Sequence, residues 1–255
     1  MSTRLVLPDG ELTLLGRITT ASNATFVGTI DGVRVVYKPV AGEQPLWDFP
    51  GATLATREVA TYLVSEALGW DVVPPTWVRE GPHGPGMVQL WREPDPGQEA
   101  VTVVPARAVP DGLLHVVDGL GADGEPVALV HEDSVALRRV AVLDVLVNNA
   151  DRKGGHVLEM PGGHRHGCDH SLTFHVEPKL RTVLWGWVGE PLLAQELTAV
   201  RRVRELVDGP LGTALASLVD DDEVSALAGR CDVLLARGEF PAPSGDMPAV
   251  PWPPF

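Results

Sequence analysis

Alternating apolar and polar positions dominate the first ninety residues, a pattern typical of strands with one buried face. It predicts strands at residues 11–18, 25–30, 33–39, 72–78 and 87–91. Asp31 and Gly32 give a tight-turn signal, and another turn is expected at residues 80–86. Apolar residues at helical spacing predict one helix at residues 53–68, closed by Gly69. The first part of the chain is therefore expected to be a sheet with one helix.

Helical periodicity prevails later in the chain. An almost wholly apolar run, which Asp133 or Ser134 can cap, predicts a central and buried helix. A strand and a turn over residues 156–164 predict a hairpin. Further helices are expected at residues 191–207, 211–219 and, after an acidic capping run, 220–238. Residues 101–117 have a mixed pattern that predicts no single element.

Composition narrows the class of protein. A net charge of −14 over 255 residues argues against nucleic acid as a partner and against electrostatic adhesion to anionic lipid. No apolar run approaches membrane-spanning length, and the N-terminus lacks a secretory signal pattern. Cys168 and Cys231 form no disulfide framework. We therefore expect a cytoplasmic protein without integral membrane association, and we assume a monomer.

The stretch that follows the apolar helix carries the candidate chemistry. Residues 149–156 read Asn-Ala-Asp-Arg-Lys-Gly-Gly-His, which places Asp151 in a loop. The return strand of the expected hairpin brings Asp169 near that loop. Two carboxylates from two loops are what phosphoryl transfer needs, because one can orient the acceptor hydroxyl while the other holds Mg²⁺ on the nucleotide phosphates.

Residues 149–156 and 169–172 resemble the catalytic and metal loops of phosphatidylinositol 3-/4-kinase-like enzymes, a wider group that includes the HipA-type kinases. The usual pattern is Asp-Arg-His-x-x-Asn, followed by an Asp at the metal position. The resemblance implies an α+β, two-lobed atypical protein-kinase-like fold that uses ATP and Mg²⁺. It implies an N-lobe at residues 1–91 and a C-lobe at 92–240, and composition adds a Pro-rich tail at 241–255.

The resemblance also implies roles for the loop residues. Asp151 would orient the acceptor hydroxyl, and Arg152 or Lys153 would offset charge near the γ-phosphate. Asp169 and His156 would bind the metal. Lys153 stands where the family commonly has His, and His156 stands where the metal-binding Asn is expected. Because Mg²⁺ prefers oxygen ligands, an imidazole at this position makes Mn²⁺ a second expected metal.

In the same way, the resemblance places ATP against the N-lobe. Lys38 closes the strand at 33–39 and would hold phosphates, paired with Glu58 or, as the alternative, with Glu66. The polar turn with Ser22 and Asn23 would cover the phosphates, although an ordinary hairpin turn explains it equally simply. Adenine would lie against the backbone of Gln89, Leu90 and Trp91.

The acceptor remains open among several classes. An inositol- or sugar-type compound or a phosphoinositide is expected first, and a protein Ser/Thr acceptor, as in HipA-type kinases, is the alternative. A nucleotide-binding pseudokinase without transfer activity is the non-enzyme alternative, motivated by His156.

Two further interpretations concern neighbouring residues. Asp144, inside the apolar helix, needs a partner and is expected to brace the catalytic loop. The hairpin offers a structural zinc site as a rival interpretation, because His164 and His166 share one strand face and Cys168 continues it. Such a site would require a closed set of four nitrogen or sulfur ligands.

Overall fold

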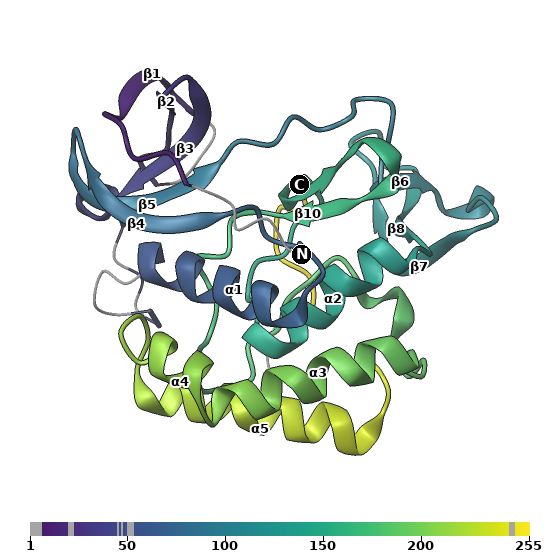
Figure 1. The fold of residues 1–255 in the computed structure, drawn as a ribbon. Coiled ribbons are helices and arrows are strands. Elements are labelled where there is room, and N and C mark those ends of the chain that lie inside the picture. The colour runs from purple at the N-terminus through teal and green to yellow at the C-terminus, as the bar shows by residue number, and fades with distance from the viewer. Residues whose placement is uncertain (1–6, 20–22, 45, 47, 50–53, 245–247) are drawn as a thin grey trace.

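The strands of the N-terminal region form an antiparallel sheet in the order β1-β2-β3-β5-β4 (Figure 1). Their bounds are Thr13–Arg17 (β1), Phe26–Ile30 (β2), Val33–Pro39 (β3), Thr76–Gly81 (β4) and Gly84–Leu90 (β5). Helix α1, Leu54–Leu68, packs against β4 and β5. The structure is a computed structural model and describes residues 7–19, 23–44, 46, 48–49, 54–244 and 248–255.

Because side chains alternate along β3, one face of the sheet packs in the core and the other face carries a candidate site residue. Tyr37 is fully buried in the core on one face of the sheet, and the next residue, Lys38, projects from the opposite face. Lys38 lies across from Met87 of β5, and Met87 packs on Val59 of α1. Opposed residues in antiparallel strands share a face, so Lys38 is directed toward α1.

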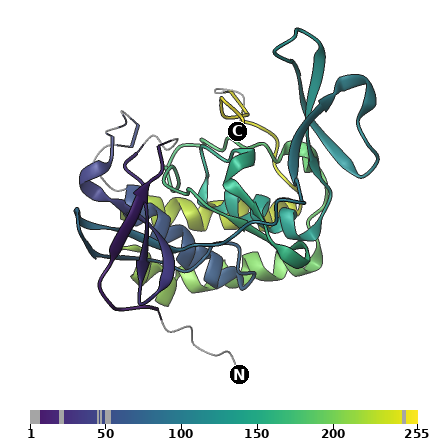
Figure 2. The same cartoon turned by 90° about the horizontal axis from the view of Figure 1, so that it is seen from above.

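A second sheet, in the order β6-β8-β7, lies between the two main regions of the sequence. Its strands are Val101–Pro105 (β6), Leu113–Leu120 (β7) and Pro126–Glu132 (β8). The β7–β8 hairpin projects from the body of the protein (Figure 2). Val103, Val117 and Leu120 are exposed on this sheet. Much of it therefore has no buried face, which explains the mixed pattern of residues 101–117.

Helix α2, Val135–Val147, lies in the centre of the C-terminal core, as its apolar run predicts. Ser134 caps it by accepting a hydrogen bond from the amide of Leu137 at 3.1 Å, and Asn148 ends it in the left-handed conformation. Helices α3 (Ala194–Val207), α4 (Pro210–Leu215) and α5 (Asp221–Arg237) form the base below α1 (Figure 1). None of the helices in the described residues is long and apolar enough to cross a membrane.

The expected hairpin is formed by β9, Val157–Glu159, and β10, Arg165–Gly167. Its turn uses Gly162 and Gly163, both at positive φ, a conformation that glycine adopts without steric cost. Gly167 pairs with Val157, so the chain enters and leaves the hairpin at the same end. The loops before β9 and after β10 are therefore neighbours, as the sequence predicted.

The α+β class is confirmed, with a β-rich N-terminal region and a helical C-terminal region. Some bounds differ from the prediction. Strand β4 begins at Thr76 rather than at residue 72, because the two prolines before it offer no N–H to a ladder. Pairing of β4 with β5 continues to Gly81 and Gly84, which shortens the turn expected at 80–86. Helix α3 begins later than expected, and α4 ends earlier.

Candidate active site

A cavity of about 490 Å³ lies between the N-terminal sheet and the loops that flank the β9–β10 hairpin. Its apolar wall is formed mainly by Ile18, Val36, Met87, Leu90 and Leu158. Its polar wall carries Lys38, Asp151, Lys153, His156 and Asp169. The cavity therefore has an apolar part that suits a flat base and a polar part that suits phosphate and metal.

Lys38 joins two carboxylates at this cavity. Its ammonium nitrogen lies 2.6 Å from Oε1 of Glu58 and 2.8 Å from Oδ1 of Asp169. The other oxygen of Glu58 accepts a hydrogen bond from the amide of His170 at 3.1 Å. Glu58, rather than Glu66 at the far end of α1, is thus the partner of the strand lysine. The contacts tie β3, α1 and the loop after β10 together.

The charges of this group stabilise one another. Burial alone would lower the pKa of Lys38, but attraction to Asp169 and Glu58 outweighs burial and raises this pKa above its ordinary value. Burial would raise the pKa of Asp169, but attraction to Lys38 outweighs burial and holds it below its ordinary range. Asp169 is therefore a carboxylate and Lys38 an ammonium at neutral pH.

His156 has the orientation and protonation state of a metal ligand. Its Nδ1 lies 3.0 Å from the carbonyl oxygen of Asp151, and because a carbonyl only accepts, Nδ1 carries the proton. Burial lowers the pKa of His156 despite the nearby Asp169, so the ring is neutral and Nε2 keeps its lone pair. Nε2 is 3.6 Å from Oδ2 of Asp169. Two ligands about 2.1 Å from one ion lie roughly 3 to 3.5 Å apart, so the two side chains fit a shared cation.

Asp151 faces the same cavity from the loop before β9. Its amide is held by Oδ1 of Asn149 at 3.0 Å, which fixes the start of the loop. Oδ2 of Asp151 lies 3.8 Å from the ammonium of Lys153. Burial raises the pKa of Asp151, while Lys153 opposes the shift and Asp169 adds to it. A raised pKa makes this carboxylate a better proton acceptor than a free aspartate.

Arg152 is placed differently from the expected position beside a γ-phosphate. Its side chain is fully buried and forms a paired contact with Asp144, at 2.8 and 2.9 Å. It also donates to the carbonyl oxygens of His156, at 3.0 Å, and Cys168, at 3.1 Å. Arg152 thus links the loops before β9 and after β10 to α2. Asp144 supports the loop of Asp151 through this contact, as the sequence analysis expected. Among the two basic residues proposed for the charge-offsetting role, Lys153 is the one that lines the cavity.

The expected nucleotide residues lie along the opposite wall. Asn23 lines the cavity and accepts a hydrogen bond from the amide of Gln44 at 2.9 Å, while Ser22 lies outside the described residues. Gln89, Leu90 and Trp91 also line the cavity. The amides of Leu90 and Trp91 donate to the carbonyls of Pro75 and Arg34, at 2.9 and 3.0 Å. Those two amides therefore form backbone hydrogen bonds in this structure and are not free to bind a base.

Comparison with known proteins identifies a relative of high sequence identity. No family model matches the sequence. The chain is 49% identical over 263 residues to Protein Rv2133c of Mycobacterium tuberculosis, and the alignment covers 98% of this chain and 94% of that protein. The chain belongs to the Rv2133c family.

Solved structures resemble this Rv2133c-family member only distantly. The Helicobacter pylori proinflammatory kinase CtkA shares 9% identity, with a TM-score of 0.45 over 91% of this chain and 93% of that one. HipA, from the Shewanella oneidensis toxin–antitoxin complex with HipB and operator DNA, shares 13% identity, with a TM-score of 0.39 over 92% and 73%. At these TM-scores neither likeness carries an inference about function.

One contact at the site of this Rv2133c-family member had no signal in the sequence. The amide of Gly154, in the loop of Asp151, donates to the carbonyl of Pro254 at 2.8 Å. A Cβ atom on Gly154 would collide with the ring of Phe255, so glycine permits this approach without a shift of that ring. The Pro-rich composition of the tail excludes a regular helix or a central strand but does not indicate where the tail docks.

Proposed function

We propose that this protein is a phosphotransferase that uses ATP and a divalent metal to phosphorylate a hydroxyl group. The observation that carries the proposal is the position of Lys38, held between Glu58 and Asp169 at a cavity that Asp151 also faces. A buried ammonium with two carboxylate partners, next to a cation-binding pair and a carboxylate of raised pKa, matches the needs of phosphoryl transfer.

In this proposal, some site residues position the reacting groups and others stabilise the negative charge of the phosphates. Glu58 is fixed by the amide of His170 and orients Lys38, whose ammonium is placed to bind phosphate oxygens. Asp151 receives or orients the proton of the acceptor hydroxyl, which its raised pKa favours. Lys153 lies next to Asp151 and offsets negative charge at the transferring group.

Asp169 and His156 would hold the metal, which neutralises charge on the nucleotide phosphates when it is bound. The neutral Nε2 of His156 and a carboxylate oxygen supply one nitrogen and one oxygen ligand. A nitrogen ligand is less suited to Mg²⁺ than to Mn²⁺. We therefore propose that Mn²⁺ supports the reaction at least as well as Mg²⁺.

For the acceptor we propose a soluble hydroxyl compound of the inositol or sugar type. The net charge of −14 is unfavourable for work at an anionic membrane surface, which a phosphoinositide acceptor would require. A Ser or Thr hydroxyl of a protein would use the same residues and is the first alternative.

A nucleotide-binding pseudokinase is a second candidate function. It is favoured by His156, which replaces the oxygen ligand expected at the metal position. Such a protein would bind ATP in the cavity through Lys38 and would transfer nothing.

The test is ATP turnover with Mg²⁺ or Mn²⁺, measured alone and with inositols, sugars, protein acceptors and phosphoinositide vesicles. The Asp169→Ala variant is run beside the wild type, and Asp222→Asn, a change at an exposed carboxylate of α5, is the matched control. Acceptor-dependent turnover that Asp169→Ala abolishes and Asp222→Asn leaves intact supports the kinase and identifies its acceptor class. Tight ATP binding without turnover under any condition supports the pseudokinase instead.

A further inference from the structure

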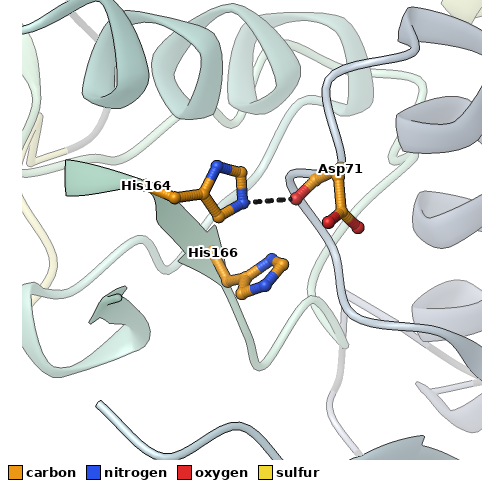
Figure 3. A group of neighbouring side chains, drawn as sticks. All are labelled: Asp71, His164 and His166. Carbon is orange, nitrogen blue, oxygen red and sulfur yellow. Dashed lines mark hydrogen bonds between the residues drawn. The ribbon is translucent and has the colours of Figure 1, made fainter. Parts of the chain in front are cut away.

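A second group of metal-ligating side chains lies outside the cavity. His164 precedes β10, His166 lies within it, and Asp71 follows helix α1. One ligand atom from each of the three lies within 4.8 Å of the others. Figure 3 shows the two imidazole rings on one side and Asp71 on the neighbouring segment, with the carbonyl oxygen of Asp71 hydrogen-bonded to His164. Two elements far apart in the sequence thus bring two nitrogens and one carboxylate together.

The histidines occupy one face for a simple reason. Residues two apart on a strand project to the same side, and the rings of His164 and His166 pack edge to face with centroids 4.5 Å apart. Cys168 does not join them, although the sequence suggested it. Its thiol lines the nucleotide cavity, where burial and the negative charge of Asp169 raise its pKa to about 12. The third ligand is a carboxylate from another element instead.

The backbone around the three side chains is fixed by hydrogen bonds. Nε2 of His164 lies 2.9 Å from the carbonyl oxygen of Asp71, and Nδ1 of His166 lies 3.3 Å from that of Val72. The amide of Gly167 also donates to the carbonyl of Val72 at 2.8 Å. Ligands that share one ion at about 2.1 Å lie roughly 3 to 3.4 Å apart. The three ligand atoms now lie within 4.8 Å of one another, so they must move closer by roughly 1.5 Å to share one ion.

The donor set and its surroundings select the class of metal. His166 is buried, His164 is half-buried and Asp71 is exposed, which leaves one side open to water. Two imidazoles, one carboxylate and water are the ligands of zinc in open protein sites, whereas Mg²⁺ and Ca²⁺ favour all-oxygen sets.

We propose that Asp71, His164 and His166 form a zinc site that joins the segment after α1 to the β9–β10 hairpin. The hairpin connects the loop of His156 to the loop of Asp169. An ion bound here would connect both loops to the segment after α1. It would lie outside the cavity that Lys38 and Asp169 line. The site stands on its own geometry and does not depend on the proposed kinase function.

The test is zinc binding by the full chain, freed of any polyhistidine tag, measured by equilibrium dialysis and by the thermal midpoint with and without Zn²⁺. We expect one zinc equivalent and a raised midpoint in the wild type. The variants His164→Gln and Asp71→Asn each replace a zinc ligand by a weaker amide oxygen. In both variants the changed position is not fully buried, so the fold is expected to survive. Each should weaken zinc affinity by more than about 10-fold, since even outer-shell changes weaken metal sites by about that factor.

Two controls locate the ion. His115→Gln changes an exposed histidine of β7 and should keep the zinc equivalent. The double variant His156→Ala/Asp169→Ala removes the candidate cation pair in the cavity and should also keep it. Unchanged zinc binding in His164→Gln and Asp71→Asn overturns the proposal. So does loss of the zinc equivalent in the double variant alone, which would place the ion in the cavity.

Discussion

The ammonium nitrogen of Lys38 lies 2.8 Å from a carboxylate oxygen of Asp169, and this contact crosses the cavity from the sheet to the loop after β10. Lys38 also contacts Glu58 at 2.6 Å, so one cation is shared by two anions. If a nucleotide with its metal enters the cavity, its phosphates and the metal compete for these groups. The Lys38–Asp169 contact would therefore link nucleotide binding to the relative position of the N-terminal sheet and the loop after β10.

Removal of Lys38 should destabilise the protein. The variant Lys38→Met leaves Glu58, whose side chain is 1% exposed, as an unpaired buried charge. Breaking a buried pair in this way costs about 3–5 kcal/mol of unfolding free energy. The double variant Lys38→Met/Glu58→Gln should recover part of the loss because it removes that charge. Urea unfolding measures both, with Glu66→Gln on the same helix as a control of small effect. A fully stable Lys38→Met would contradict the buried pair.

Asp151→Asn should abolish transfer and leave the protein folded. The amide cannot accept the hydroxyl proton, and loss of such a transition-state contact lowers kcat by a factor of about 10² or more. ATP affinity should change little, because Asp151 faces the acceptor side of the proposed reaction. Steady-state kinetics with the acceptor found by the panel, together with ATP binding by calorimetry, check both points. Near-normal turnover in Asp151→Asn would reject the assignment.

His156→Asn should change the metal preference rather than simply remove activity. The substitution exchanges the imidazole nitrogen near Asp169 for an amide oxygen, which Mg²⁺ accepts more readily. We expect the ratio of turnover with Mg²⁺ to turnover with Mn²⁺ to rise by about 10-fold. The measurement is the two rates at saturating metal, with His115→Gln as the matched control. An unchanged ratio would exclude His156 as a ligand.

Asp169 should make stability depend on pH in the acid range. Its pKa is held below the ordinary value of about 3.9 by attraction to Lys38, which outweighs the opposing effect of burial. The stabilisation is therefore fully present above about pH 4 and is lost as the pH falls through the lower folded-state pKa. In Asp169→Asn it is absent at every pH. The difference in urea midpoint between wild type and variant should thus shrink below about pH 4, and a constant difference would contradict this.

Much of the candidate site follows from local patterns in the sequence. Alternation along residues 33–39 places Lys38 on the face opposite Tyr37. Glu58 of α1 was expected as the partner of Lys38 from the family resemblance, and the ion pair is present. The hairpin signal brings the loop of Asp169 next to the loop of Asp151. These relations depend on regular elements, whose geometry the sequence pattern encodes directly.

The remaining features depend on contacts that no local pattern encodes. Arg152 lies in a loop, where alternation does not decide which way a side chain points. The buried Asp144 and the carbonyl oxygens of His156 and Cys168 direct it inward. His164 meets the carbonyl of Asp71 across 93 residues of sequence, so the pairing follows from tertiary packing alone. The projecting β6-β8-β7 sheet was not predicted as a whole. Apolar residues on its exposed faces interrupt the alternation of apolar and polar positions that indicates a strand.

The contact between Gly154 and the tail has a practical consequence. The carbonyl of Pro254 receives the amide of Gly154 at 2.8 Å, and Phe255 is half exposed beside it. Any polypeptide fused after Phe255 would emerge next to the loop that carries Asp151. A purification handle is therefore better placed elsewhere, whereas a small fluorophore at this end would report directly on movement of the loop.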